Sequence, residues 1–233
     1  MRTRRSRTVF RTRSAVSGRI RVVDHARERR LMVSGDTLSI LPLDGDWSGL
    51  EREYWGRAIA AAPLPPRPTA LLVGLGGGTQ AHLLHRAHRP RLITVIERDP
   101  AIVRVATRWF RLGDLPRLEF LCGDADTVVP SLVRARRRFD FVMEDAAYAD
   151  EPARSERLAR SLVPLVSARG ILVVNRHRRG DARALAAALG PHFAEVRVRL
   201  VRRQAENALV CCRSPGPKGA YRGHPPGTER AAR

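Results

Sequence analysis

A glycine-rich turn constrains the fold of this chain more than any other feature of its sequence. The apolar residues 70–73 lead directly into the glycines of this turn, which are Gly74, Gly76, Gly77 and Gly78. This order predicts a buried parallel strand, a tight turn and a helix that begins near Thr79. The backbone N–H groups of such a turn form a concave site for a nucleotide or an anionic group. A glycine cluster can also simply close a strand–helix turn, so other parts of the chain must decide between the two interpretations.

Beyond the turn, apolar runs typical of strands alternate with segments typical of helices throughout residues 67–212. This alternation predicts an α/β domain with a doubly wound, mostly parallel, seven-stranded sheet and helices on both faces. The last two runs, 196–201 and 208–212, are separated by only six residues. A parallel crossover needs a dozen or more, so these runs must pair as an antiparallel hairpin. Such a hairpin is typical of the Rossmann-like fold of methyltransferases that use S-adenosylmethionine.

Three further segments differ from this domain in composition. Residues 1–18 are expected to form a disordered basic arm, because residues 1–19 contain seven arginines and no acidic residue. Residues 19–66 predict a small N-terminal antiparallel β unit, a helix over 50–62 and a proline-rich linker. Residues 213–233 are rich in proline, glycine and charge, and are expected to form a disordered tail.

The net charge of +20 suggests a nucleic-acid partner at first sight. The cationic residues are spread along the whole chain, so binding of nucleic acid through the basic arm is kept only as a minor alternative. No apolar run is long enough to cross a membrane, and we expect no membrane partner. Two of the three cysteines lie in apolar runs, which favours reduced thiols and a cytoplasmic protein.

Acidic residues stand where three successive strands of the α/β domain are expected to end. These residues are Glu97, Asp124 and Asp145. Ligands of doubly wound sheets bind outside the carboxyl ends of the strands, so the three side chains should meet at one edge. There Glu97 could accept from ribose hydroxyls and Asp124 from an adenine amino group, while Asp145 would face the group beyond the nucleoside. Strand-end aspartates are also common helix N-caps, and for Asp124 both roles remain open.

The identity of the nucleotide follows from the position after the glycines. A dinucleotide fingerprint requires a third spaced glycine where this chain has Thr79, which argues against NAD. S-adenosylmethionine or its decarboxylated form fits better. A metal is not expected, because His82, His85 and His88 share a helix at a spacing that spreads them around it, with no carboxylate nearby.

Residues 19–212 resemble the spermidine synthase family, the polyamine aminopropyltransferases, and especially its divergent bacterial members. The resemblance rests on Val-Gly-Leu-Gly-Gly-Gly-Thr (73–79), Val-Ile-Glu-Arg-Asp-Pro (95–100), Gly-Asp-Ala (123–125), Phe-Asp-Phe-Val-Met-Glu-Asp (139–145) and Gly-Ile-Leu-Val-Val-Asn (170–175). It implies a transferase that moves an aminopropyl group, or a methyl group, to a small amine or an unknown acceptor. Family members commonly form homodimers.

The resemblance also implies roles for individual residues. Asp145 would orient and deprotonate the attacking amine as the catalytic base. The cofactor would be held by Gly74, Gly76, Gly78, Glu97, Asp124 and Ala125. The acceptor would lie against Tyr54, Tyr148 and Asp150, although Tyr54 could instead pack the β unit onto the main domain.

The chain departs from the family pattern at three positions. The family has an Asp where Gly77 stands, a second acid where Tyr148 stands and a Gln where Leu38 stands. A diamine carries two positive charges that need carboxylates to replace water, so these changes disfavour a putrescine pocket. Three activities therefore stay open: aminopropyl transfer, methyl transfer to an unknown acceptor, and nucleoside binding without turnover by a protein whose basic arms contact nucleic acid.

Overall fold

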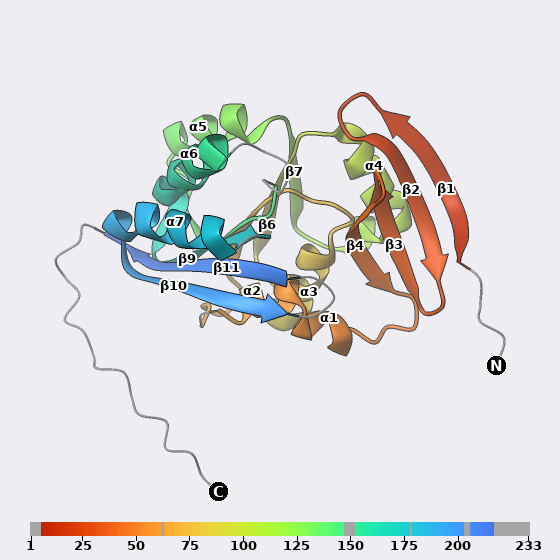
Figure 1. Cartoon of the computed structure of the whole chain (residues 1–233), viewed down its shortest axis with the longest axis horizontal. Helices are drawn as coiled ribbons and strands as arrows, with labels where there is room; N and C mark the ends of the chain where they lie inside the picture. The colour runs from red at the N-terminus through yellow and green to blue at the C-terminus, as the bar shows by residue number, and fades with distance from the viewer. Residues whose placement is uncertain (1–5, 62, 147–151, 178, 203–205, 217–233) are drawn as a thin grey trace, which may run out of the picture.

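The computed structural model describes residues 6–61, 63–146, 152–177, 179–202 and 206–216, which form two β-sheets with helices packed around the larger one (Figure 1). The smaller sheet is antiparallel, with its strands in chain order. Its strands are β1 (Arg7–Ser14), β2 (Gly18–His25), β3 (Glu28–Val33) and β4 (Asp36–Pro42). Alternating apolar residues put one face of this sheet, including Ile20, Val22 and Leu31, into the core.

The larger sheet has seven strands in the order β10-β11-β9-β8-β5-β6-β7. They are β5 (Thr69–Val73), β6 (Leu92–Glu97), β7 (Leu118–Cys122), β8 (Phe139–Glu144), β9 (Val166–Arg176), β10 (Phe193–Arg202) and β11 (Glu206–Pro215). Strand β11 runs antiparallel to both β9 and β10, while the pairs from β9 to β7 are parallel. The expected fold class and its closing hairpin are therefore confirmed.

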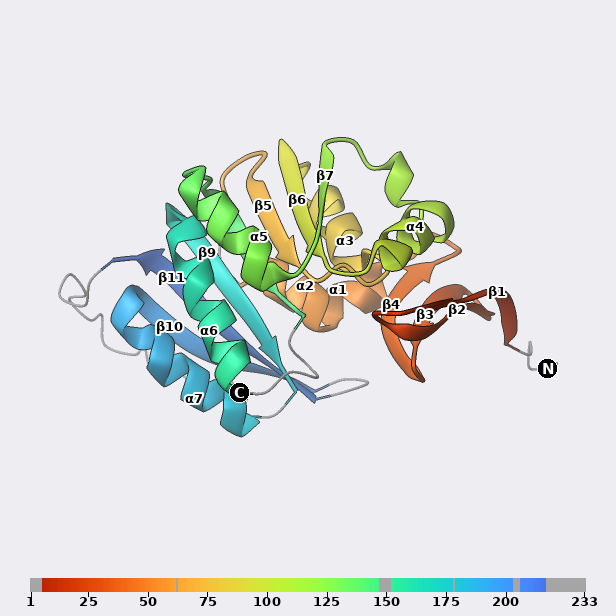
Figure 2. The same cartoon turned by 90° about the horizontal axis from the view of Figure 1, so that it is seen from above.

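Helices cover both faces of the large sheet (Figure 2). One face carries α2 (Tyr54–Ile59), α3 (Thr79–His88) and α4 (Pro100–Trp109), and α1 (Ser48–Arg52) precedes α2. The other face carries α5 (Ala125–Arg134), α6 (Pro152–Leu162) and α7 (Arg179–Leu189). The single helix expected over 50–62 is wrong, because Glu53 is extended at φ −75° and ψ 173° and separates α1 from α2.

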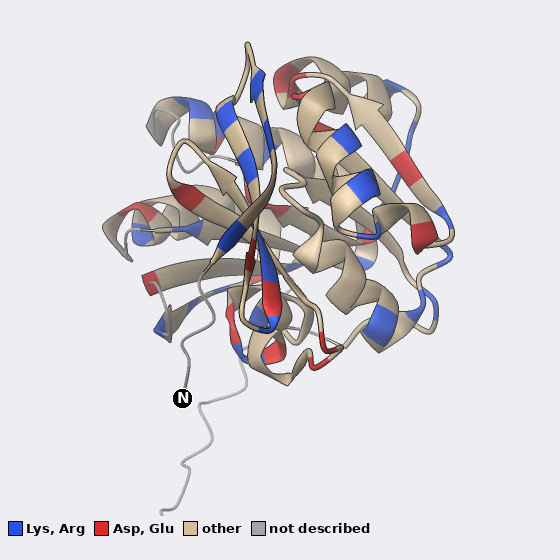
Figure 3. Ribbon diagram, turned by 90° about the vertical axis from the view of Figure 1, so that its right-hand side faces the viewer, with Lys and Arg blue, Asp and Glu red and all other residues tan. Residues whose placement is uncertain are grey.

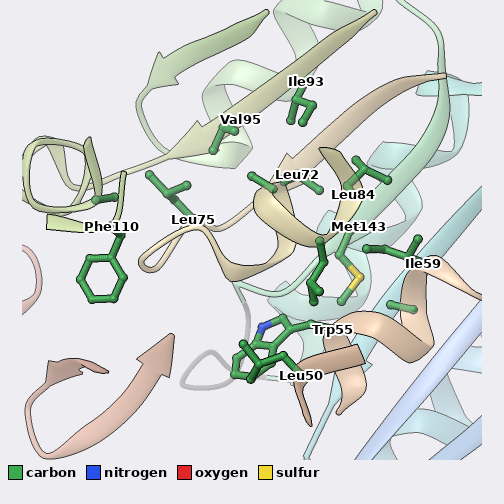
Figure 4. Close-up of a cluster of buried hydrophobic side chains, with 14 of the residues drawn as sticks. Leu50, Trp55, Ile59, Leu72, Leu75, Leu84, Ile93, Val95, Phe110 and Met143 are labelled. Atoms are coloured by element: carbon green, nitrogen blue, oxygen red, sulfur yellow. The ribbon is translucent and has the colours of Figure 1, made fainter. Parts of the chain in front are cut away.

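Each face of the large sheet buries its own hydrophobic core. The first core also contains the small sheet, so one apolar cluster joins the N-terminal β unit to the α/β domain. In its centre, Leu50 and Trp55 from the N-terminal helices lie near Met143 of β8 (Figure 4). Burial of such side chains contributes roughly 1.5–3 kcal/mol each, so the two units form one packed body.

The expected disordered arm over residues 1–18 is wrong from Arg7 to Ser14, because these residues form β1 and pair with β2. High charge and little apolar surface favour an unstructured arm, but Val9 and Phe10 pack against the core, and the Phe10 ring lies 5.4 Å from that of Trp109. The expected C-terminal tail is wrong for residues 213–215, which belong to β11. Its remaining residues from 217 onward lie outside the described residues.

Candidate functional site

The glycine turn follows β5 and leads into α3, as the sequence predicted. Gly74 has φ 93°, and a Cβ there would lie 3.1 Å from the carbonyl oxygen of Asp145. Gly78 has φ 85°, and a Cβ there would lie 2.6 Å from the Leu112 side chain. Both positions therefore require glycine, on grounds of backbone angle and of space. Gly76 also has a positive φ, of 53°.

Strand β4 of the small sheet holds the glycine turn in place. The Ser39 hydroxyl accepts a hydrogen bond from the backbone N–H of Gly77 at 2.7 Å. The Thr79 hydroxyl donates to the carbonyl of Ile40 at 2.8 Å and accepts from its N–H at 2.9 Å. Leu38 is partly buried beside these contacts. We call these hydrogen bonds of Ser39 and Ile40 with Gly77 and Thr79 the clamp. Nothing in the sequence indicates the clamp, since its partners lie on different units of the chain.

Glu97 ends β6 and connects its carboxylate to the glycine turn. One oxygen accepts from the backbone N–H of Leu75 at 3.0 Å, and the other from that of Asp99 at 2.9 Å. Burial raises the pKa of Glu97, although the two hydrogen bonds act in the opposite direction. A carboxylate has about four acceptor positions, so each oxygen can still accept one further hydrogen bond. Two adjacent hydroxyls, such as those of a ribose, match that capacity.

Asp145 follows β8 and lies in a partly buried hydrogen-bond network. Its carboxylate accepts from the Tyr54 hydroxyl at 2.7 Å and from the Asn175 side-chain amide at 2.8 Å. Its backbone N–H donates to the carbonyl of Val73 at 2.9 Å, next to Gly74. Burial raises the pKa of Asp145 to about 6, against the lowering effect of the two side-chain hydrogen bonds. A carboxyl group of this pKa can exchange a proton near neutral pH.

Two residues that the sequence interpretation did not single out complete this network. Asn175 is the penultimate residue of β9, and its side-chain carbonyl oxygen Oδ1 is buried with no hydrogen-bond partner among the described residues. Arg176 forms a buried ion pair with Glu144 at 2.6 Å, and Glu144 in turn accepts from the N–H of Ala146. The ion pair therefore fixes the backbone on both sides of Asp145. The only sequence signal was that Asn175 closes one of the motifs of the resemblance.

Asp124 follows β7 and acts as the N-cap of α5. Its side chain accepts from the backbone N–H of Asp126 at 2.9 Å and pairs with Arg154 of α6 at 2.9 Å. The pKa of Asp124 is lowered, chiefly by the Asp126 hydrogen bond, although partial burial opposes this. The N-cap alternative is thus confirmed. Contacts of Asp124 and of Ala125, the first residue of α5, with an adenine ring stay predictions.

The predicted acids meet at one edge of the large sheet. Glu97 contacts the glycine turn through Leu75, and its own carbonyl accepts from the N–H of Gly123, one residue before Asp124. Asp145 lies against Gly74 on the other side of the turn. Tyr148 and Asp150 lie outside the described residues, so their predicted contacts with an acceptor stay untested.

The described part of the chain contains no group of three side chains suited to bind a metal ion. His82 is buried instead, with Nε2 at 2.7 Å from the carbonyl oxygen of Phe110, and burial lowers its pKa.

Cys122 is exposed, whereas Cys211 and Cys212 are buried thiols. Among the described helices, none is both long and apolar enough to span a membrane.

No protein-family model matches the chain, but two kinds of curated transferase do. An eEF1A lysine and N-terminal methyltransferase of Danio rerio is 30% identical over 160 residues, covering 64% of this chain and 23% of that protein. A polyamine aminopropyltransferase of Vibrio vulnificus is 25% identical over 126 residues, covering 52% of this chain and 42% of that protein. The chain thus spans less than half the length of either relative.

Solved structures share the fold. Spermidine synthase of Thermotoga maritima superposes with a TM-score of 0.66 at 15% identity, covering 89% of this chain and 72% of that one. Human methyltransferase-like protein 13, in complex with SAH, superposes with a TM-score of 0.54 at 24% identity, covering 72% of this chain and 79% of that one. The fold is therefore common to spermidine synthases and to methyltransferases, as the sequence resemblance implied.

Proposed function

We propose that this chain binds S-adenosylmethionine or its decarboxylated form at the carboxyl edge of the large sheet and transfers a carbon group to an amine. One observation carries the proposal: a half-buried Asp145 carboxylate stands beside the glycine turn and accepts hydrogen bonds from Tyr54 and Asn175. With a pKa of about 6, this group is mostly ionised at neutral pH and can take a proton from the attacking nitrogen.

The nucleoside fits the residues around Asp145. Gly74 and Gly76 have positive φ values, and a Cβ at either position would meet Asp145 or Ser39, so only glycine allows the turn to pack this tightly beside Asp145. Glu97 would bind the ribose hydroxyls with its two remaining acceptor positions. Asp124 would accept from the adenine amino group, with Ala125 beside the ring. The buried Oδ1 of Asn175 is an acceptor still lacking a partner among the described residues, and it suits a donor on the cofactor or on the acceptor amine.

The reaction is a direct displacement at a carbon attached to sulfur. The lone pair of the amine nitrogen forms the new C–N bond while the C–S bond breaks. The electron pair of that bond goes to sulfur, which changes from a cationic sulfonium to a neutral thioether. Asp145 takes the proton that the nitrogen releases, and Tyr54 holds the carboxylate in position. Alignment of the two reactants can lower the activation free energy by ~7–11 kcal/mol, and proton removal can raise the rate by about 10²–10⁴-fold.

Two classes of acceptor amine are compatible with the proposed reaction. The TM-score is higher with a spermidine synthase than with methyltransferase-like protein 13, which favours aminopropyl transfer to a small amine. Sequence identity is higher to a protein methyltransferase, which favours methyl transfer to a lysine side chain or an N-terminal amine. We propose that Tyr148 and Asp150, three and five residues after Asp145, border the acceptor in either case. With Tyr148 in place of a second acid, a singly charged amine suits this site better than a diamine.

Calorimetric titration tests the cofactor. The full-length protein would be titrated with S-adenosylmethionine, its decarboxylated form and methylthioadenosine. We expect one of the two sulfonium compounds to bind more tightly. Tighter binding of S-adenosylmethionine would assign methyl transfer, and tighter binding of its decarboxylated form would assign aminopropyl transfer. Mass spectrometry of turnover mixtures with putrescine, spermidine and lysine-containing peptides then identifies the acceptor. Binding of none of the three nucleosides would overturn the proposal and leave the alternative of a protein without transferase activity.

A further inference from the structure

The outer face of the β1–β2 ribbon carries four arginines in two directly opposed pairs. The strand register places Arg11 opposite Arg21 and Arg13 opposite Arg19. Residues two apart on a strand lie on the same side, and opposed residues share a face, so all four side chains belong to one surface. We call this surface the arginine face. Arg11, Arg13 and Arg19 are exposed, and Arg21 is half-buried.

The arginine face is hollowed and its charge is not compensated. Its four arginines line a hollow of about 360 Å³ together with the threonines Thr8 and Thr12. Within the described residues, no ion pair joins any of the four to a carboxylate. The nearby acids Asp24 and Glu28 are paired with other arginines, Arg29 and Arg30. Figure 3 shows the side of the molecule to which this ribbon belongs, with cationic segments along its strands.

This arrangement is unfavourable for the protein alone. Like charges directly opposite each other destabilise an antiparallel pair. The fold does not need them, because the inward residues Ile20 and Val22 already anchor the ribbon in the core. Since the basic face is costly and structurally unnecessary, it points to a partner that supplies negative charge. Arginine suits phosphate in particular, because its planar guanidinium donates two parallel hydrogen bonds to phosphate oxygens.

We propose that the arginine face binds the phosphate backbone of a nucleic acid. Along each strand its arginines repeat every ~6.8 Å, so they present a regular row of cations to a regular row of anions. Among the described residues, the only exposed large apolar side chains are Val16 and Leu43, too few and too scattered to insert into a lipid surface. A second copy of the chain that docked through the same face would bring eight arginines together, and their charges would repel. This binding would not depend on the proposed transferase activity.

The test measures the salt dependence of binding to short labelled duplexes of RNA and of DNA. Each phosphate neutralised contributes about 0.9 to the slope of log affinity against log salt for B-form DNA. The variant R11Q/R13Q/R19Q/R21Q should therefore flatten the DNA slope by about 3 to 4.

The matched control R134Q/R157Q/R160Q/R183Q removes the same charge from exposed arginines on α5, α6 and α7, away from the ribbon (Figure 2). It should change the slope by less than about 1. Comparison of the two duplexes identifies which nucleic acid is preferred.

Folding of the ribbon variant is checked by thermal unfolding. Because the variant removes two like-charge pairs, its melting temperature should equal or exceed that of the wild type. The proposal fails if the wild-type protein does not bind either duplex at low salt, or if both variants flatten the slope equally. It also fails if anionic phospholipid vesicles or an acidic polypeptide bind the arginine face more tightly than the duplexes do.

Discussion

At the scale of single residues, the chemistry of the site lies in two carboxylates, Glu97 and Asp145, that burial makes easier to protonate. Burial raises the pKa of both, and for Asp145 it reaches about 6. The two differ in their partners. The Glu97 carboxylate accepts hydrogen bonds from two backbone N–H groups, which fixes the glycine turn. The Asp145 carboxylate accepts hydrogen bonds from two side chains. The first pattern suits binding, and the second suits proton transfer.

Asp145→Asn should reduce turnover by about 10²–10⁴-fold, because an amide cannot accept the proton. Nucleoside affinity, measured by calorimetry, should change little. In the wild type, kcat/KM should rise as pH increases through about 6, since the carboxyl group must lose its proton before it acts. The residual activity of the variant should lack that rise. Turnover equal to wild type would exclude Asp145 as the base.

Glu97→Gln should weaken nucleoside binding by about 10- to 100-fold, since hydrogen bonds to a charged acceptor contribute about 1.5–3 kcal/mol. The amide also presents only one acceptor oxygen to the Leu75 and Asp99 N–H groups. Glu119→Gln on the neighbouring strand is the matched control, since Glu119 pairs with Arg137 and not with the glycine turn. Equal affinities of the two variants in calorimetric titration would argue against a ribose contact.

At the scale of elements, the small sheet supports the cofactor turn directly. The partners of the clamp, Ile40 and Thr79, lie 39 residues apart and are both buried. Thr79 stands at the position where a dinucleotide-binding chain has glycine. Its hydroxyl forms hydrogen bonds with two backbone groups of β4, the N–H and the carbonyl of Ile40. The N-terminal unit is thus part of the site's construction and not a separate appendage.

Thr79→Val tests this clamp. The substitution keeps the shape of the side chain but leaves the N–H and C=O of Ile40 without their partner, which costs about 1–3 kcal/mol for each buried group left unsatisfied. Urea unfolding should show this loss, and calorimetry should show weaker nucleoside binding. Thr107→Val removes an exposed hydroxyl of α4 that bonds within its own helix, and should change stability by less than about 0.5 kcal/mol. Similar effects of both variants would contradict the clamp.

At the scale of the whole molecule, the raised pKa of Asp145 makes stability depend on pH. The unfolded carboxyl group of Asp145 ionises near 3.8 and the folded one near 6, so folding is opposed as pH rises between these values. Below about pH 3 both states are protonated, and above about pH 7 both are ionised and the difference is constant. A shift of this size corresponds to about 3 kcal/mol.

Asp145→Asn should remove this contribution. The free energy of unfolding of the variant, relative to wild type, should therefore increase by about 3 kcal/mol between pH 3 and pH 7. Denaturant unfolding of both proteins at a series of pH values measures the difference, in which the other titrating groups cancel. A difference that does not change with pH would show that the Asp145 carboxyl group has an ordinary pKa.

The sequence by itself determined the sheet, its closing hairpin and the edge where the acids gather. These features follow from local order along the chain: apolar runs form strands, glycines form the turn, and acids at strand ends share one edge. It also indicated both roles open to Asp124, of which the N-cap is present.

Only the tertiary structure decided which side chains face these acids. Tyr54 and Asp145 lie 91 residues apart, and Asn175 lies 30 residues from Asp145. Periodicity cannot pair residues across separate elements, because the packing of those elements sets the pairing. The same reason explains β1. Charge favoured an unstructured arm, but pairing with β2 and contact of Phe10 with Trp109 outweigh the repulsion.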